Sequence, residues 1–130
     1  MLDTNTVSHL IRQHPRVTGR VTALSPQAMC ISAITEAELH FGLARHGGAR
    51  MLRDLVTAFL RTVESLVWNS SAAQVYGSLR ARLQRSGEPL ASLDMLIAAH
   101  ASATGCVLVT NDKAFRRVPD LQVEDWTLPA

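Results

Sequence analysis

Met1-Leu2-Asp3-Thr4-Asn5 opens the chain with two apolar residues, a carboxylate, and then hydroxyl and amide side chains. We interpret this stretch as the end of a short buried strand. A parallel sheet presents the residues that follow its strands in a crevice at the carboxyl edge, where open α/β proteins place their ligands. The stretch therefore predicts that Asp3 lies in a cleft, although Asp, Thr and Asn are also the residues that cap helix N-termini.

The composition is that of a globular domain. The 130 residues are 47% hydrophobic and 18% charged, with a formal net charge of +2. A chain of this length buries about two thirds of its unfolded surface without disulfides or metals. Every basic residue except Lys113 is Arg, and the Arg fork suits phosphate and carboxylate partners. Codon bias would explain the excess of Arg equally well.

The cysteines and the apolar runs indicate where the protein works. Cys30 and Cys106 have no metal-type spacing, so we expect free thiols in a reducing cytosol. No apolar run approaches the roughly 18 residues of a membrane span. The sequence therefore predicts a soluble, cytoplasmic protein with no membrane partner.

Helical and strand patterns alternate along the chain. Ser32 and Ser92 are expected N-caps, while Gly47-Gly48 and Gly105 are expected to end helices. Alternation of this kind is typical of a single α/β domain, here residues 1–130, with a mostly parallel sheet. Apolar spacing predicts a first helix that ends before His14-Pro15, then helices over residues 16–24, 34–46, 52–63, 72–83 and 92–104, and strands over 28–31, 66–68, 106–110 and 121–126.

Acidic residues return to the sheet edge that Asp3 should occupy. Asp112 follows the predicted strand 106–110, and Asp94 lies in the first turn of a buried helix, where the helix dipole favours negative charge. In the helix 34–46, Ile34, Ala37, Glu38 and Phe41 share a face that we expect to contact the core. Leu39 and Leu43 lie on the side of Glu36, so periodicity alone leaves the choice between Glu36 and Glu38 open.

Several carboxylates in one cleft need a counter-charge. Two charges about 5 Å apart repel by about 3 kcal/mol at an effective dielectric of about 20. Neither His nor Cys stands at ligand spacing, so a hard cation such as Mg²⁺ or Mn²⁺ fits better than zinc. Acid clusters that bind such ions suit the hydrolysis of phosphodiesters.

Four segments carry a resemblance to a known family. In chain order they are MLDTN (residues 1–5), ISAITEAELHFG (31–42), GEPLASLDMLIAAHA (87–101) and VLVTNDKAF (107–115). They resemble the four acidic motifs of the PIN-domain nucleases, and most closely those of the bacterial VapC toxins of type II toxin–antitoxin systems. The resemblance covers essentially the whole chain, down to VEDW at residues 123–126.

The resemblance implies a fold, a site and partners. It implies a PIN-like α/β/α sandwich that forms a homodimer and acts as a Mg²⁺- or Mn²⁺-dependent endoribonuclease. The RNA substrate would be tRNA or another structured RNA, cut to leave a 5′-phosphate and a 3′-hydroxyl, and a VapB antitoxin would inhibit the enzyme. The family's metal-binding acids fall on Asp3, Glu38, Asp94 and Asp112, with Glu38 at the acid of the E-L-x-x-G pattern, and its supporting polar residues on Thr4, Asn5, Thr110 and Asn111.

One departure and two alternatives accompany this prediction. Only Met1 and Leu2 precede Asp3, so either the true start lies upstream or the central strand is short. The alternatives are a non-catalytic RNA- or protein-binding PIN-like module, in which the acids serve as helix caps, and a phosphoacceptor receiver domain, for which Lys113 follows Asp112 too closely. The residues predicted to hold the RNA backbone are Arg80, Arg82, Arg85, Arg116 and Arg117.

Overall fold

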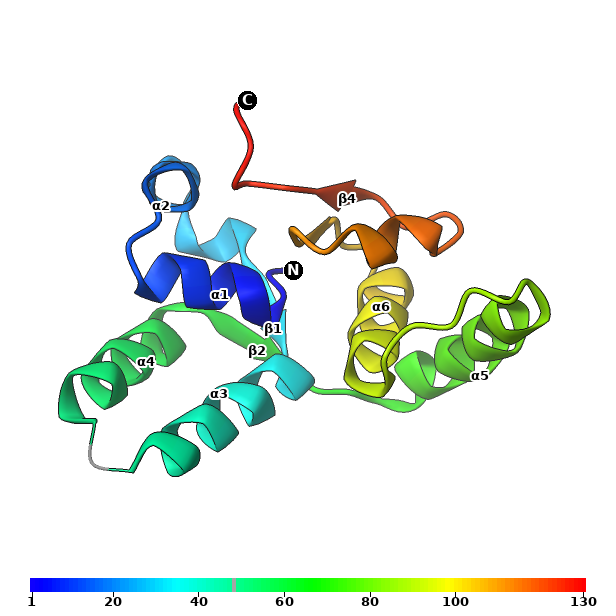
Figure 1. Ribbon diagram of the computed structural model, residues 1–130, viewed down its shortest axis with the longest axis horizontal. Coiled ribbons are helices and arrows are strands. Elements are labelled where there is room, and N and C mark those ends of the chain that lie inside the picture. The colour runs from blue at the N-terminus through cyan, green and yellow to red at the C-terminus, as the bar shows by residue number, and fades with distance from the viewer. Residues whose placement is uncertain (48) are drawn as a thin grey trace.

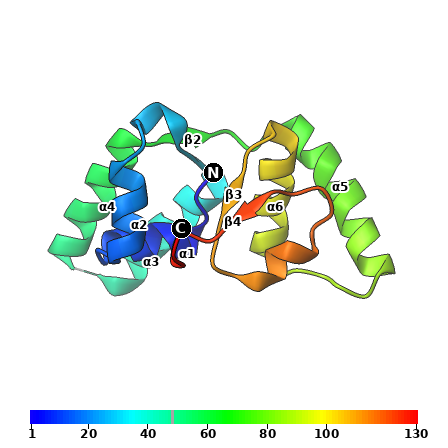
Figure 2. The ribbon, with the colours of Figure 1, turned by 90° about the horizontal axis from the view of Figure 1, so that it is seen from above.

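Helices lie on both faces of a small sheet in the computed structural model, which describes residues 1–47 and 49–130. The helices are α1 (Thr4–Ile11), α2 (Pro15–Thr22), α3 (Ala33–His46), α4 (Arg50–Thr62), α5 (Ser70–Arg85) and α6 (Ser92–Thr104), with the 3-10 turns η1 (Pro26–Ala28) and η2 (Lys113–Arg117). The strands are β1 (Cys30–Ser32), β2 (Glu64–Leu66), β3 (Leu108–Val109) and β4 (Val123–Glu124). Helices α1 to α4 gather on one side of the strands and α5 and α6 on the other (Figures 1 and 2), which confirms the predicted α/β/α sandwich.

The stretch Met1-Leu2 is the central strand of a parallel sheet. Strand β1 pairs with β2 and β3 pairs with β4, both in parallel. Leu2 joins the two pairs, because it bridges Ile31 on one side and Val109 on the other, again in parallel. The Leu2 amide donates to the Cys30 carbonyl at 2.9 Å, and the Asp3 amide donates to the Val109 carbonyl at 3.0 Å. The two bridges of Leu2 therefore hold the two strand pairs together in one sheet.

Alternation along the central strands divides the core between the two helical layers. Met1 and Leu108 pack in the cluster formed with α5 and α6. Leu2, Ile31 and Val109 pack in the cluster formed with α1 to α4. Because the side chains of a strand alternate between faces, two or three residues per strand suffice to anchor both layers.

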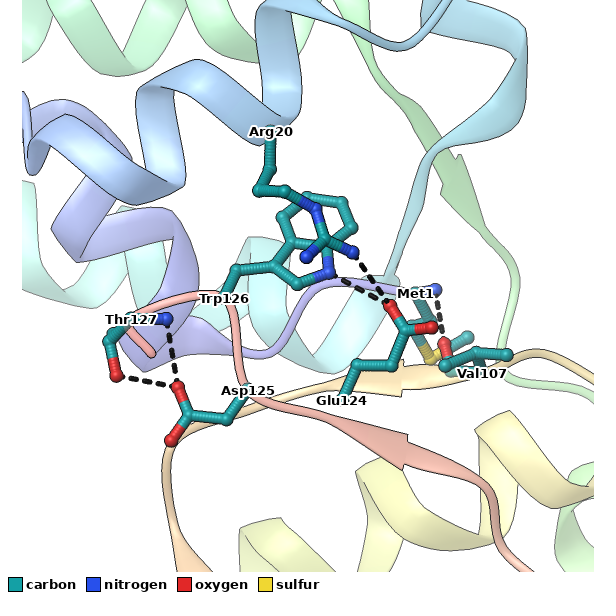
Figure 3. Close-up of polar contacts among 7 residues, drawn as sticks. All are labelled: Met1, Arg20, Val107, Glu124, Asp125, Trp126 and Thr127. Atoms are coloured by element: carbon teal, nitrogen blue, oxygen red, sulfur yellow. Dashed lines mark hydrogen bonds and ion pairs between the residues drawn. The ribbon is translucent and has the colours of Figure 1, made fainter. Parts of the chain in front are cut away.

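The start of the chain is fixed by its neighbours. The Met1 ammonium group donates to the Val107 carbonyl at 2.7 Å (Figure 3), so the ladder with the segment before β3 continues to the first residue. Met1 and Leu2 are both buried. Asp3 is therefore presented by a well-anchored strand.

The C-terminal segment is held against α2 by the buried Trp126 ring and by polar contacts around it. The Glu124 carboxylate accepts from the Trp126 indole N–H at 2.9 Å and lies 3.4 Å from the Arg20 guanidinium. That guanidinium also stacks over the Trp126 ring, 5.1 Å from its centroid (Figure 3). The pair Arg20 and Glu124 is partly exposed, so we ascribe most of the anchoring to the buried Trp126 ring.

Several predicted boundaries were wrong by about two residues. The predicted strand 28–31 begins only at Cys30, because Pro26 starts the turn η1 that includes Ala28. The predicted strand 66–68 lies at 64–66, and Val67 is 76% exposed. Strands 106–110 and 121–126 shorten to 108–109 and 123–124.

The predicted helix ends were partly right. Ser32 caps α3 by accepting from the Ile34 amide at 3.1 Å, as predicted. Ser92 does not cap α6, because Ala91 occupies the N-cap position and Ser92 is already helical. Gly105 ends α6 in the left-handed region, with φ of 68°. Gly47 follows α3, while Gly48, the second half of the predicted stop, lies outside the described residues.

Two smaller expectations concern the cysteines and the membrane. Cys30 and Cys106 are both free, with their sulfur atoms 3.9 Å apart. In the described parts of the chain, no helix combines the length and the apolar character needed to cross a bilayer.

Candidate active site

Asp3 both leaves the central strand and caps the helix that follows. Its Oδ1 accepts from the Thr6 amide at 2.8 Å, and only 4% of the residue is exposed. Burial raises the pKa of Asp3, the hydrogen bonds from Thr110 and Thr6 lower it, and the nearby charge of Asp112 raises it further. Asp3 is therefore both the residue at the strand end and the cap of α1. Capping uses Oδ1, so the two interpretations of this residue are compatible.

Glu38 is directed toward the same region by the residue next to Asp3. The Thr4 hydroxyl donates to Glu38 Oε1 at 2.6 Å and lies 3.4 Å from the Thr35 hydroxyl. Glu36 is directed elsewhere, since its carboxylate accepts from the Ser65 hydroxyl of β2 at 2.7 Å and lies 3.8 Å from His40. The structure thus separates the two acids that periodicity could not.

The predicted core face of α3 was mostly wrong, although Ile34 does pack against the core cluster of α5 and α6. Phe41, expected on that face, is 65% exposed, whereas Thr35, Leu39 and Leu43 are the buried residues. Leu39 and Leu43 pack in the cluster shared with α1, α2 and α4. In this arrangement Glu38 is half-buried and lies at the edge of the packed face. It is close to Thr4 and is not within an apolar stripe.

The pKa of Asp94 is affected by the other three acids. It lies half-buried in the first turn of α6. Desolvation raises the pKa of Asp94 to about 6, with further upward contributions from the charges of Asp112, Glu38 and Asp3. Asp94 therefore lies close enough to the other three acids for their charges to raise its pKa.

Asp112 follows β3 as Asp3 follows the central strand. Its Oδ1 accepts from the Ala114 amide at 2.9 Å and so caps the turn η2. Its own amide donates to the Thr110 hydroxyl at 3.0 Å. Thr110 is buried and also hydrogen-bonds to the Asp3 carboxylate, so one threonine connects two of the acids.

The other predicted polar residues have fewer contacts. Asn5 and Asn111 are exposed, and among residues 1–47 and 49–130 we find no hydrogen bond from either side chain. Thr4 and Thr110, by contrast, each contact a carboxylate of the cluster. The role of the two asparagines stays a prediction.

The four acids interact through their charges rather than through direct contact. Across the described ranges, no three His, Cys, Asp or Glu side chains stand close enough to ligate one ion. The donors are all oxygen, and their mutual repulsion raises the pKa of Asp94. Mg²⁺ binds through one or two carboxylates and keeps several waters, so the chemistry of the cluster fits a hydrated hard cation better than a tightly caged one.

A groove that the sequence did not reveal adjoins Glu38. It has a volume of about 520 Å³ between α1, α3 and α4, and its lining includes Glu38, Phe41, Arg12 and Arg45. The Arg45 guanidinium lies 5.6 Å from the centroid of the exposed Phe41 ring. The signal in the sequence was Phe41 itself, an aromatic residue beside the leucines that form the true core face.

The predicted RNA-binding arginines fall in two places, and all are exposed. Arg116 and Arg117 lie on η2, directly after Asp112. Arg80, Arg82 and Arg85 lie on α5, the outer helix of its layer (Figure 2), and Arg80 donates to the Tyr76 hydroxyl at 2.9 Å. The first pair therefore follows one of the acids directly along the chain, whereas the α5 group belongs to a separate helix.

A strand-end carboxylate cluster in an α/β/α sandwich defines a class of protein. Residues 1–121 match the PIN domain family, which is the family that the four motifs suggested.

Individual relatives narrow the class further. The chain is 37% identical over 127 residues to the tRNA(fMet)-specific endonuclease VapC of Salmonella typhimurium, covering 97% of this chain and 96% of the relative. It is 33% identical over 129 residues to ribonuclease VapC2 of Rickettsia felis, with 97% and 96% covered. The chain therefore belongs to the VapC ribonucleases of the PIN domain family.

Solved structures agree with this assignment. The VapBC2 complex of Rickettsia felis bound to promoter DNA contains a chain that matches with a TM-score of 0.89 and 32% identity, covering 97% of both chains. The DNA-bound VapBC complex of Salmonella typhimurium matches with a TM-score of 0.89 and 38% identity, covering 97% of this chain and 96% of the other.

Proposed function

We propose that this chain is an endoribonuclease toxin that hydrolyses phosphodiester bonds in tRNA or another structured RNA. Membership of the VapC ribonucleases supports the reaction, and the similarity to chains of VapBC complexes supports a VapB antitoxin as the inhibitor. We further propose that it acts as a homodimer in the bacterial cytoplasm. The observation that carries the catalytic role is geometric: Asp3 follows the central strand, Asp112 follows the neighbouring strand β3, and Thr4, next to Asp3, donates to the Glu38 carboxylate.

The four acids would bind a divalent ion, and neighbouring threonines would position them. Asp3, Glu38, Asp94 and Asp112 would hold Mg²⁺ or Mn²⁺, which supplies an activated water and stabilises charge on the leaving oxygen when bound. Thr4 fixes the Glu38 carboxylate, and Thr110 hydrogen-bonds to the Asp3 carboxylate and accepts from the backbone amide of Asp112. Burial and the charges of the other acids raise the pKa of Asp94 to about 6 in the metal-free protein, so Asp94 loses its proton as the pH approaches neutrality.

The polar surroundings would contact the substrate. Asn5 and Asn111 are exposed beside the acids, where an amide can reach RNA or an ordered water. Arg116 and Arg117 follow Asp112 on η2 and would hold the RNA backbone, since Arg binds phosphate through paired hydrogen bonds. The three arginines of α5 would extend this contact along a longer RNA.

Asp94→Asn tests the catalytic role. Asn keeps the shape of Asp94 but removes the charge, so we expect loss of cleavage by about a hundredfold or more, with the fold retained. The assay is cleavage of purified tRNA with Mn²⁺ or Mg²⁺, and circular dichroism checks the fold. The matched control is Asp54→Asn, on an exposed position of α4, which should cleave normally. A folded Asp94→Asn protein that cuts RNA at the wild-type rate would remove the assigned role.

A binding module is the second candidate, because two of the acids already serve as caps. Asp3 caps α1 and Asp112 caps η2, as the non-catalytic alternative requires. Such a module would bind RNA or a partner protein equally well with and without divalent ions. Chelation by EDTA separates the two candidates, since it should stop RNA cleavage by the enzyme and leave the properties of the module unchanged.

A further inference from the structure

A buried histidine connects the two helices that carry Glu38 and Asp94. His100 lies on α6, is 1% exposed, and places Nδ1 2.7 Å from the Ser32 hydroxyl oxygen. Ser32 is 0% exposed and is the N-cap of α3, where its Oγ accepts from the Ile34 amide at 3.1 Å. A hydrogen-bonded path therefore runs from α6 through His100 and Ser32 to the first turn of α3.

The direction of each hydrogen bond follows from the groups at the two ends of the path. The backbone carbonyl of Val67 accepts from the His100 ring, and burial lowers the pKa of His100, so the ring is neutral. A neutral imidazole has one donor and one acceptor nitrogen. Nδ1 is then the acceptor, the Ser32 hydroxyl donates to it, and Ser32 Oγ remains free to accept from Ile34.

A fully satisfied buried network of this kind restricts geometry. Each member would pay a desolvation penalty if its partner moved away, so the arrangement has one preferred position. Within the described residues, the contact between His100 and Ser32 is the one side-chain hydrogen bond that joins α6 to the segment of Ser32 and α3. Neighbouring positions on α6, such as Ala98, Ala99 and Ala101, contribute only apolar packing.

We propose that His100 is a positioning residue that, through Ser32, fixes Glu38 relative to Asp94 and thereby sets the affinity of the acid cluster for a divalent ion. The inference rests on the proposed function, because it concerns the same four acids. Helix α3 carries Glu38 and begins at Ser32, while α6 carries both Asp94 and His100. Loss of the link frees the two helices to shift, and Glu38 shifts with α3.

The test measures Mn²⁺ binding in the absence of RNA, by titration calorimetry of the full-length protein. His100→Leu removes both ring contacts and should weaken Mn²⁺ binding by about tenfold or more, the usual effect of removing an outer partner of a metal site. His100→Asn keeps an acceptor near the place of Nδ1 and should restore most of the affinity. Ser32→Ala should weaken Mn²⁺ binding less in the His100→Leu background than in the wild type, because the two changes share one link and Ser32→Ala also removes the cap of α3.

Controls separate positioning from stability. Ile97→Val removes one methylene from the same helix at a position that is 1% exposed, and it should lower the melting temperature without changing Mn²⁺ affinity. Each titration is made at a temperature where circular dichroism shows the variant to be folded. Wild-type affinity in folded His100→Leu, or an equal loss of affinity in Ile97→Val, overturns the inference. Absence of Mn²⁺ binding to the wild-type protein instead overturns the proposed function, and the inference with it.

Discussion

At the scale of the residue, Asp94 costs the metal-free protein stability. The folded pKa of about 6 lies above the ordinary value of 3.8, so the folded state holds this proton more tightly than the unfolded state. The resulting contribution to stability is fully present below about pH 4 and is lost as pH rises through 6. At neutral pH the ionised Asp94 carboxylate lowers the stability of the folded protein, and such costly groups are typical of functional sites.

Asp94→Asn should therefore stabilise the metal-free protein near neutral pH. The full shift corresponds to about 3 kcal/mol, and exposure of the half-buried side chain reduces the expected gain to about 1 kcal/mol. Near pH 4 the gain should vanish, because the wild-type carboxyl is then protonated. Urea unfolding in EDTA at both pH values measures the difference. A mutant that is less stable than the wild type at neutral pH contradicts the assigned origin of the shift.

Thr4 is the second residue whose contribution can be isolated. Its hydroxyl donates to Glu38 at 2.6 Å, so Thr4→Val keeps the volume and removes the hydrogen bond. We expect the divalent-ion concentration for half-maximal cleavage to rise by about tenfold. Thr4→Ser retains the hydroxyl and should behave nearly as the wild type. Equal metal requirements in the Val and Ser variants would show that Thr4 does not orient Glu38.

At the scale of the element, the sequence predicted which segments form helices and strands better than where they begin. Helices carry a periodic pattern over many residues, whereas these strands have only two or three residues each. In β2 the apolar run included Val67, yet pairing with β1 put Leu66 opposite Ser32 and ended the strand there. Tertiary pairing, rather than local apolar character, set that boundary.

Gly105 is the element-scale position where backbone conformation is most restrictive. Its φ of 68° is in the left-handed region, and a Cβ added there would meet no atom within 4 Å. Gly105→Ala should therefore destabilise through backbone strain alone, by about 1 kcal/mol. Gly77→Ala is the matched control, because Gly77 lies inside α5 with equally open space, and Ala in a helix interior should stabilise by about 0.5–1 kcal/mol. Urea unfolding of the two variants should give shifts of opposite sign.

At the scale of the whole molecule, the topology of the sheet places acidic residues near one another that helical periodicity alone could not assign to one site. Asp3 and Asp112 were predictable, because each follows a strand and the carboxyl ends of parallel strands share one edge. The choice of Glu38 over Glu36 depends on how α3 packs, and a hydrogen bond from Thr4 reveals it. The groove beside Glu38 and the link through His100 join segments that are distant in sequence, so local patterns gave at most one sign of them, the aromatic Phe41 in the groove.

Salt dependence tests how the arginines act on RNA over the whole surface. The formal net charge is only +2, so binding must depend on where the arginines lie rather than on their number. Removing one arginine that binds a phosphate should reduce the slope of log K against log salt by about 0.7 for a single strand and about 0.9 for a duplex. Arg116→Ala with Arg117→Ala should therefore lower the slope by about 1.4 to 1.8, measured by fluorescence anisotropy of labelled tRNA on an Asp94→Asn background. Arg53 and Arg61 of α4, which are equally exposed, provide a control of the same charge, and their replacement by Ala should leave the slope unchanged. Equal changes in both double mutants would mean that net charge alone attracts the RNA, and that the pair beside Asp112 has no particular role.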